Sequence, residues 1–472
     1  MDADSSTPWE GTPLVPEKSP STCSRLAASA WLVVTSGAGL LADGYDLMVI
    51  DLVVADIASL YPGAMEPKDK SLTVSACLLG VIIGQLSFGT LIDLVGAKVA
   101  SMVTACLIVA AAVASACCVP GARLGLALQL AICRFFMGLG IGGEYPVSAA
   151  LGVEGHGSVA GADSGAFYGS RPQLQTLIAG MFNLGSALTG CVVLGLINTS
   201  LSLEHVWRWA LGLGAVPAFV ALIARASLPS GDVSSPQRPA TCCEAGLSGY
   251  FNRFLRAVGP RRMLLLGACL SWALFNLTMY GQNSFRSIIS NSIYGSRAGE
   301  TVEEILRTDA VFSLTMSLCT LAGTLVATLL VDRLRRYQLQ ILGFGGAALT
   351  MWTCGALLCG LPASLDWPLV LCNYTWVILI VQVSVTTYLI PAECFPATAR
   401  ATCFGIAAAS GKIGALVGTA LFPICEAAFG LSTVLVASGL VSLLGIMVTL
   451  LLTPRVDIDP AELDSQATKE VN

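Results

Sequence analysis

Several ionisable side chains lie inside stretches of sequence that are otherwise apolar. Lys412 occurs in AAASGKIGALVG, Glu144 in MGLGIGGEYPVSAALGVE, and Asp43 and Asp46 in GLLADGYDLMVI. An ionisable group at the centre of a membrane-spanning helix costs about 2.5–3.5 kcal/mol on insertion scales, and such groups commonly mark ion or substrate pathways. These residues are therefore the first candidates for chemistry.

The spacing of the polar residues groups them on helix faces. Asp43 and Asp46 are three residues apart and share one face. Lys412 has no acid within its own apolar stretch and lies too deep to reach water easily. The acids outnumber the cations, which suits a cavity whose groups exchange protons and which binds an anion at the lysine. A structural alternative, in which the aspartates pair with Arg134, fits the same residues.

A second polar stripe occurs in WALFNLTMYGQN. Trp272, Asn276 and Tyr280 follow at i, i+4 and i+8, so they lie along one side of a helix. Such a stripe could line a binding site, although an aromatic stripe of this kind also serves as ordinary packing between helices.

The composition indicates the elements that position these residues. The chain of 472 residues is 55% hydrophobic and 12% charged, with a net charge of −5, whereas soluble domains carry about 25% charged residues. Apolar stretches of about 20 residues, the length that crosses a bilayer, recur along the chain. We expect an all-α polytopic membrane protein, because a transmembrane barrel would show short alternating segments.

Several other functional classes lack their signatures in this sequence. Most of the 17 cysteines lie in apolar stretches and no CxxC pair occurs, and there are only two histidines. We therefore expect no metal site and no disulfide framework. No nucleophile–base pair is evident either, so we expect neither an enzyme nor a bound cofactor.

Hydropathy predicts twelve helices in two groups of six. The expected helices span 27–57, 72–95, 97–118, 124–153, 172–196, 206–228, 261–291, 306–332, 337–361, 366–395, 399–424 and 429–455. The corresponding domains are a tail 1–26, a bundle 27–228, a central loop 229–260, a second bundle 261–455 and a tail 456–472. Arginines concentrate in the central loop, so the positive-inside rule predicts that this loop and both termini are cytoplasmic.

The two halves show an internal repeat. Asp93 and Asp332 each end a predicted helix and are 239 residues apart, and Glu154 and Glu393 are separated by the same interval. Two landmarks at one offset indicate duplication of a six-helix unit. Parallel six-helix halves with substrate bound near the membrane midplane are typical of major facilitator transporters.

At these residues the sequence resembles the phosphate:proton symporter family of the major facilitator superfamily. The similar segments are GQLSFGTLIDLVGAK (84–98), RFFMGLGIGGEYPVSAALGVE (134–154), WALFNLTMYGQNSF (272–285) and TTYLIPAECFPATARATCFGIAAASGKIGALVG (386–418). The resemblance implies the major facilitator fold and import of inorganic phosphate coupled to protons by alternating access. It also implies residence in a lipid bilayer, most simply the plasma membrane, and no nucleic-acid partner.

The resemblance assigns expected roles to individual residues. The expected substrate-binding residues are Tyr145, Asn183, Trp272, Asn276, Tyr280, Ser384 and Lys412, and the expected proton-coupling residues are Asp43, Asp46 and Glu144. The chain departs from the family pattern at four of them: Asn276 replaces an acid, Asn183 a glutamine, Ser384 an asparagine and Glu144 an aspartate. Glu144 could instead be a structural partner of Arg134 or of a backbone amide.

Charged residues near the cytoplasmic helix ends are expected to form a gate. The expected pairs are Asp93 with Arg134, Glu154 with Arg171, and Glu393 with Arg400, while Asp332 repeats the position of Asp93. Such pairs could hold the outward-open state and break when the two halves rock. Ala97 stands where the superfamily motif usually has a basic residue.

Two other functions fit the same residues. The smaller Asn183 and Ser384 would leave room for a glycerophosphodiester or another organic anion. The loss of the acid at Asn276 would also suit a nutrient receptor that kept the site but no longer transports.

Overall fold

The computed structural model describes residues 21–65, 67–121, 123–159, 170–227, 246–282, 301–360 and 367–458, together with a few residues beyond 459. The described chain is helical throughout. In the first half the helices are α1 (Thr22–Leu60), α2 (Pro67–Val95), α3 (Ala97–Ala116), α4 (Leu126–Val159), α5 (Arg171–Ile197), α6 (Leu203–Gly212) and α7 (Ala215–Ala226).

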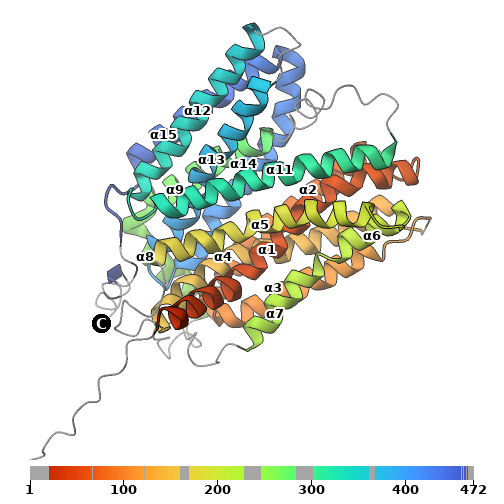
Figure 1. The fold of residues 1–472 in the computed structure, drawn as a ribbon. Helices are drawn as coiled ribbons and strands as arrows, with labels where there is room; N and C mark the ends of the chain where they lie inside the picture. The colour runs from red at the N-terminus through yellow and green to blue at the C-terminus, as the bar shows by residue number, and fades with distance from the viewer. Residues whose placement is uncertain are drawn as a thin grey trace, which may run out of the picture.

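The second half begins after a short connecting helix. That helix, α8 (Gly246–Val258), continues through a 3₁₀ turn, η2 (Gly259–Arg261), into α9 (Arg262–Gln282). The remaining helices are α11 (Val302–Leu330), α12 (Arg336–Gly360), α13 (Trp367–Glu393), α14 (Arg400–Phe429) and α15 (Leu431–Leu452). Figure 1 shows the two halves as separate bundles, coloured red to yellow-green and green to blue.

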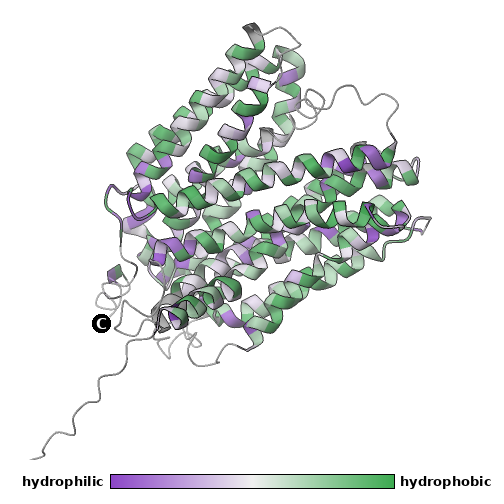
Figure 2. Ribbon diagram, viewed as in Figure 1, coloured by the Kyte–Doolittle hydropathy of each residue, from purple (hydrophilic) through white to green (hydrophobic). Residues whose placement is uncertain are grey.

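The predicted membrane-spanning architecture is confirmed. Eleven stretches among the described residues are long and apolar enough to cross a membrane, and α1, 39 residues long, packs beside α4, α5 and α7 in the same bundle. Apolar residues recur along all the helices (Figure 2), and many large apolar side chains are exposed. Exposed apolar side chains on all sides of a helical bundle are typical of a protein surrounded by lipid.

Two details differ from the predicted helices, and the end of one further helix lies outside the described residues. The sixth predicted helix, 206–228, is interrupted at Leu213 and Gly214, which separate α6 from α7. The predicted central loop 229–260 contains α8, which hydropathy did not reveal because the helix is short and amphipathic. The seventh predicted helix, 261–291, extends past Gln282 into residues outside the described part of the chain.

The two halves meet through equivalent helices. The second helix of the first half, α2, packs against α14, and its counterpart in the second half, α11, packs against α5. This exchange agrees with the internal repeat. The end of the molecule that bears α8 is called here the α8 side, and the end that bears α6 is called the α6 side (Figure 1).

Glycines bring α14 close to α9, and this contact positions Lys412. A Cβ at Gly414 would lie 2.2 Å from the carbonyl oxygen of Ala273, and one at Gly411 would lie 2.5 Å from the Trp272 ring. Small residues at such positions let two helices approach closely in a membrane. The SGKIG sequence therefore places the lysine directly beside the polar stripe of α9.

Candidate functional site

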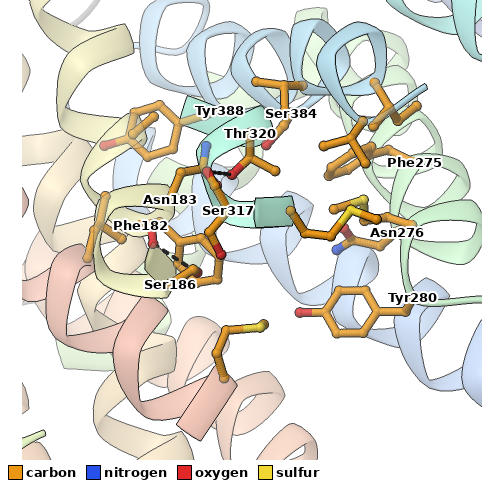
Figure 3. Close-up of a pocket in the computed structure, with 18 of the residues that line it drawn as sticks. Phe182, Asn183, Ser186, Phe275, Asn276, Tyr280, Ser317, Thr320, Ser384 and Tyr388 are labelled. Atoms are coloured by element: carbon orange, nitrogen blue, oxygen red, sulfur yellow. Dashed lines mark hydrogen bonds between the residues drawn. The ribbon is translucent and has the colours of Figure 1, made fainter. Parts of the chain in front are cut away.

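A cavity of about 150 Å³ lies between the two halves. It is lined by all seven of the expected substrate-binding residues, which are Tyr145, Asn183, Trp272, Asn276, Tyr280, Ser384 and Lys412. Polar side chains of α5, α9, α11 and α13 face one another across it (Figure 3). The structure thus brings together residues that are up to 267 positions apart in the sequence.

Lys412 is the cation of this cavity. Its side chain is buried, and Nζ donates a hydrogen bond to the Tyr280 hydroxyl at 3.0 Å. Nζ also lies 5.6 Å from the centre of the Tyr145 ring and 5.2 Å from that of Tyr280, within cation–π range. Among the residues that the structure describes, no carboxylate forms an ion pair with Lys412. The cavity therefore surrounds a positive charge with neutral groups.

The other polar groups of the cavity are neutral donors and acceptors. Asn183 Nδ2 of α5 donates to Thr324 Oγ1 of α11 at 2.9 Å, which links the two halves beside the cavity. Asn276 is 4% exposed and has its amide nitrogen close to Gly411 on α14. An amide can donate to an oxyanion and adds no negative charge.

Sequence reasoning missed several polar residues of the lining. These are Ser186 of α5, Ser317 and Thr320 of α11, and Asn373 and Tyr388 of α13. Serine and threonine are common in apolar helices, where the hydroxyl bonds to the preceding turn, as Ser317 does with Ser313. No signal in the sequence separates the few that face a cavity.

The two aspartates of α1 are buried without partners. Asp43 and Asp46 are each 0% exposed, and none of their four carboxylate oxygens has a hydrogen-bond partner in the described chain. The predicted structural pairing with Arg134 is not present. That guanidinium donates instead to the main-chain carbonyl oxygen of Asp46 at 2.8 Å. An ionised carboxylate without donors carries the full cost of burying its charge, so the protonated form fits this environment.

Asp46 also borders a second, larger cavity. This vestibule of about 690 Å³ lies on the α6 side, and Lys70, Asp51 and Asp309 line it together with Asp46. Met48, Tyr280 and Phe312 line both cavities. The vestibule therefore adjoins the Lys412 cavity.

Glu144 has a different environment from the one expected. Arg225 of α7 donates from its two terminal nitrogens to the two carboxylate oxygens of Glu144, each at 2.7 Å, and both side chains are 0% exposed. The Thr104 hydroxyl donates to the same carboxylate. The predicted alternative pairing of Glu144 with Arg134 is therefore wrong. Sequence reasoning did not single out Arg225.

The gate residues Asp93 and Asp332 make equivalent contacts on the α8 side. Asp93, at the end of α2, accepts hydrogen bonds from the backbone N–H of Ala401 and Thr402 in the first turn of α14. Asp332, after α11, accepts from the hydroxyl of Ser170, the N-cap of α5, at 2.7 and 2.8 Å. Each aspartate thus joins the end of a helix in one half to the start of a helix in the other.

Two of the predicted gate pairs are wrong. Arg134 is 1% exposed near the start of α4. Its guanidinium donates to the main chain of Asp46, whereas Asp93 accepts from Tyr250 and from the first turn of α14. Glu393 forms its ion pair with Arg336, whose Nε lies 2.9 Å from the carboxylate, and Arg400 Nε donates to the carbonyl oxygen of Phe395. The side chain of Glu154 lies outside the described part, so its pair with Arg171 stays a prediction.

Three comparisons place this architecture among known proteins. The model of the sugar (and other) transporter family matches residues 31–231 and 249–462. The chain is 28% identical to an Arabidopsis thaliana protein named probable inorganic phosphate transporter 1-6, over 88% of this chain and 90% of that protein. It is 29% identical to inorganic phosphate transporter 1-1 of Oryza sativa subsp. japonica, over 82% of each chain.

Solved structures show the same fold. The major facilitator proton:xylose symporter XylE bound to 6-bromo-6-deoxy-D-glucose aligns with a TM-score of 0.74 and 17% identity, covering 93% of this chain and 99% of that one. The inward open conformation of the Escherichia coli xylose transporter aligns with a TM-score of 0.63 and 18% identity over 93% of this chain and 99% of that one.

The fold and the family match define a class, multi-pass membrane transporters with the major facilitator fold. Within that class the chain belongs to the sugar (and other) transporter family. Proteins of this class are transporters and not enzymes.

Proposed function

We propose that the protein imports inorganic phosphate together with protons by alternating access. The observation that carries this proposal is Lys412, a buried lysine in a cavity between the two halves with only neutral polar groups around it. A buried cation without a counter-charge is unfavourable, so an anion that binds there is held strongly. The names of the related plant proteins support phosphate as that anion.

The cavity offers the donors that a phosphate oxygen needs. Lys412 supplies a compact positive charge, while Tyr145, Tyr280, Asn183 and Asn276 line the same space and can donate O–H or N–H bonds. In a site shielded from water these bonds are stronger than in bulk solvent. Trp272 and Phe275 close the cavity with apolar surface.

Protons are needed to make import favourable. Drawing one negative charge into a negative-inside cell costs about 2.3 kcal/mol per 100 mV. If more protons than the anion has charges enter with it, the net charge moved is positive, and the membrane potential then favours import. Asp43 and Asp46 are the proposed carriers, because their carboxylates have no partners and Asp46 borders the vestibule. Glu144 is engaged by Arg225 on both oxygens, so its proposed role is to hold α4 against α7.

The contacts at the α8 and α6 sides support an orientation of the protein in the membrane and a conformational state. Arg253, Arg256, Arg261 and Arg262 lie in or beside α8, so the positive-inside rule favours a cytoplasmic α8 side. On that side Asp93 and Asp332 join the halves, whereas the vestibule lies on the α6 side. We therefore interpret the structure as an outward-facing state of a plasma-membrane importer, with both termini cytoplasmic.

The test is uptake of radiolabelled phosphate by proteoliposomes with and without an imposed pH gradient. We expect accumulation only when the outside is acidic, and little competition from excess glycerophosphodiester. Accumulation of glycerophosphodiester in place of phosphate would assign an organic-anion substrate. Phosphate binding without uptake under any gradient would identify a receptor and contradict the proposal.

A further inference from the structure

The connecting helix α8 presents three different faces. One face packs into the protein: Tyr250 is 8% exposed, and Phe254 packs against the cluster that contains Phe395. The neighbouring face carries Phe251 and Leu255, one turn apart, which are 58% and 51% exposed. A phenyl ring and a leucine side by side on the outside of a short helix need a partner that removes them from water.

The third face of α8 is polar and basic. It carries Asn252, Arg253 and Arg256. The 3₁₀ turn η2 then leads within three residues to α9, and the candidate membrane span Gly249–Tyr280 runs from α8 through this turn into α9. A short amphipathic helix with arginine on one face and phenylalanine and leucine on the other, next to a membrane span, has the character of a helix that lies in the membrane interface. Figure 1 places α8 at the end of the molecule opposite α6.

We propose that α8 binds anionic lipid headgroups at the membrane surface on its side of the molecule. Phe251 and Leu255 insert at the boundary of the acyl chains, and Arg253 and Arg256 bind the negative charges of the headgroups. Lipid is the occupant that the geometry favours, because the basic face has the opposite charge and the helix continues into a membrane-spanning segment.

The bound helix is also connected to the gate. The Tyr250 hydroxyl donates to Asp93 Oδ2 at 3.0 Å and lies 2.6 Å from Thr402 Oγ1. Asp93 in turn accepts from the Thr402 hydroxyl at 2.6 Å and from the first turn of α14. Lipid that holds α8 in place therefore stabilises the closed gate on the α8 side. This link to transport rests on the proposed function, whereas lipid binding by α8 does not.

The first experiment measures lipid binding without transport. The full-length protein is placed in phosphatidylcholine nanodiscs with or without phosphatidylserine, and amide hydrogen exchange is measured for residues 249–258. Phosphatidylserine should slow amide hydrogen exchange of these residues in wild type. In each of the single variants Arg253→Gln and Arg256→Gln, this slowing should be about fivefold smaller. The control Arg333→Gln removes an exposed arginine between α11 and α12 and should keep the wild-type effect. Equal exchange in both lipids, or the same loss in the control, would overturn the proposal.

The second experiment measures the link to the gate. Phosphate uptake is compared in the same two lipids for wild type and Tyr250→Phe, which keeps the ring and removes the hydroxyl. Wild-type uptake should depend on phosphatidylserine, and Tyr250→Phe should lose that dependence while α8 keeps its lipid-dependent protection. A variant that retains the lipid dependence of uptake would contradict the link. If wild type transports no phosphate, the proposed function fails and the exchange experiment still decides the lipid site.

Discussion

Removing the Glu144 carboxylate leaves the Arg225 guanidinium buried without its partner. We expect Glu144→Gln to destabilise the protein by about 3–5 kcal/mol, the usual effect of breaking one side of a buried ion pair. The measurement is thermal unfolding in detergent. The matched control is Glu204→Gln, whose partner Arg208 lies 3.5 Å away in a pair that is 51% exposed at Glu204 and 24% exposed at Arg208. This change should cost less than about 1 kcal/mol. A Glu144→Gln variant as stable as the control would contradict a structural role.

The unpartnered aspartates make a separate prediction about coupling. Asn has the shape of a protonated Asp but cannot exchange the proton, so Asp43→Asn and Asp46→Asn should fold normally. They should retain phosphate exchange between equal pools and lose most accumulation driven by a pH gradient. Asp51→Asn, which changes an exposed acid of the same vestibule, serves as the control. Full gradient-driven accumulation in both α1 variants would exclude these residues as carriers.

Replacing Asn276 by aspartate should make phosphate binding weaken as pH rises. Asn276→Asp places a carboxylate beside Lys412 and the bound anion. When that carboxylate is ionised it repels phosphate and pairs with the lysine; when it is protonated it resembles the original amide. Phosphate binding by the variant should therefore approach that of wild type at low pH and become progressively weaker than wild type as pH rises. A ratio of the two Kd values that does not change with pH would contradict this placement of Asn276.

The residue types of the site were predictable because burial of charge is conspicuous in an apolar chain. Lys412, Asp43 and Glu144 were identified from that contrast alone. Arg225 was not, because it lies in the last turn of a predicted helix, where an arginine ordinarily extends to the membrane surface. Only the packing of α7 against α1 and α3 shows that it turns inward.

At the scale of helices, the ion pair between α12 and α13 predicts a rescue. Glu393→Arg alone places two cations together, and Arg336→Glu alone places two acids together. Each single variant should therefore reduce the transport rate at least about tenfold, which corresponds to 1.4 kcal/mol. The double exchange should recover most of the activity. The control exchange of Glu303 and Arg307, an exposed pair on α11, should have little effect in any combination. Absence of rescue would show that the pair does not act as a unit.

Sequence pattern located the long helices well and the short ones poorly. The predicted spans 97–118 and 399–424 begin and end within a few residues of α3 and α14. Long apolar stretches are predictable in this way because they have one stable arrangement in a membrane. The division of α6 from α7 and the helix α8 were not predicted. Both depend on a few residues whose conformation is set by neighbouring helices.

At the scale of the molecule, the internal repeat predicted more than the helix count. Asp93 and Asp332 are separated by the 239-residue interval of the repeat. They also make equivalent contacts, because each bonds to the start of a helix in the other half. The sequence did not predict which end is closed. That property depends on the relative tilt of two bundles with similar surfaces. The pairs that close the α8 side involve residues 162 and 309 positions apart.

The central claim, that Lys412 binds the transported anion, is tested most directly by equilibrium binding of radiolabelled phosphate to the purified protein. The account predicts that Lys412→Met weakens binding roughly ten- to a hundredfold, the contribution of a charged hydrogen bond. It predicts a nearly unchanged Kd for Lys70→Met, which removes an exposed vestibule lysine. Wild-type phosphate affinity in a folded Lys412→Met protein would contradict the account.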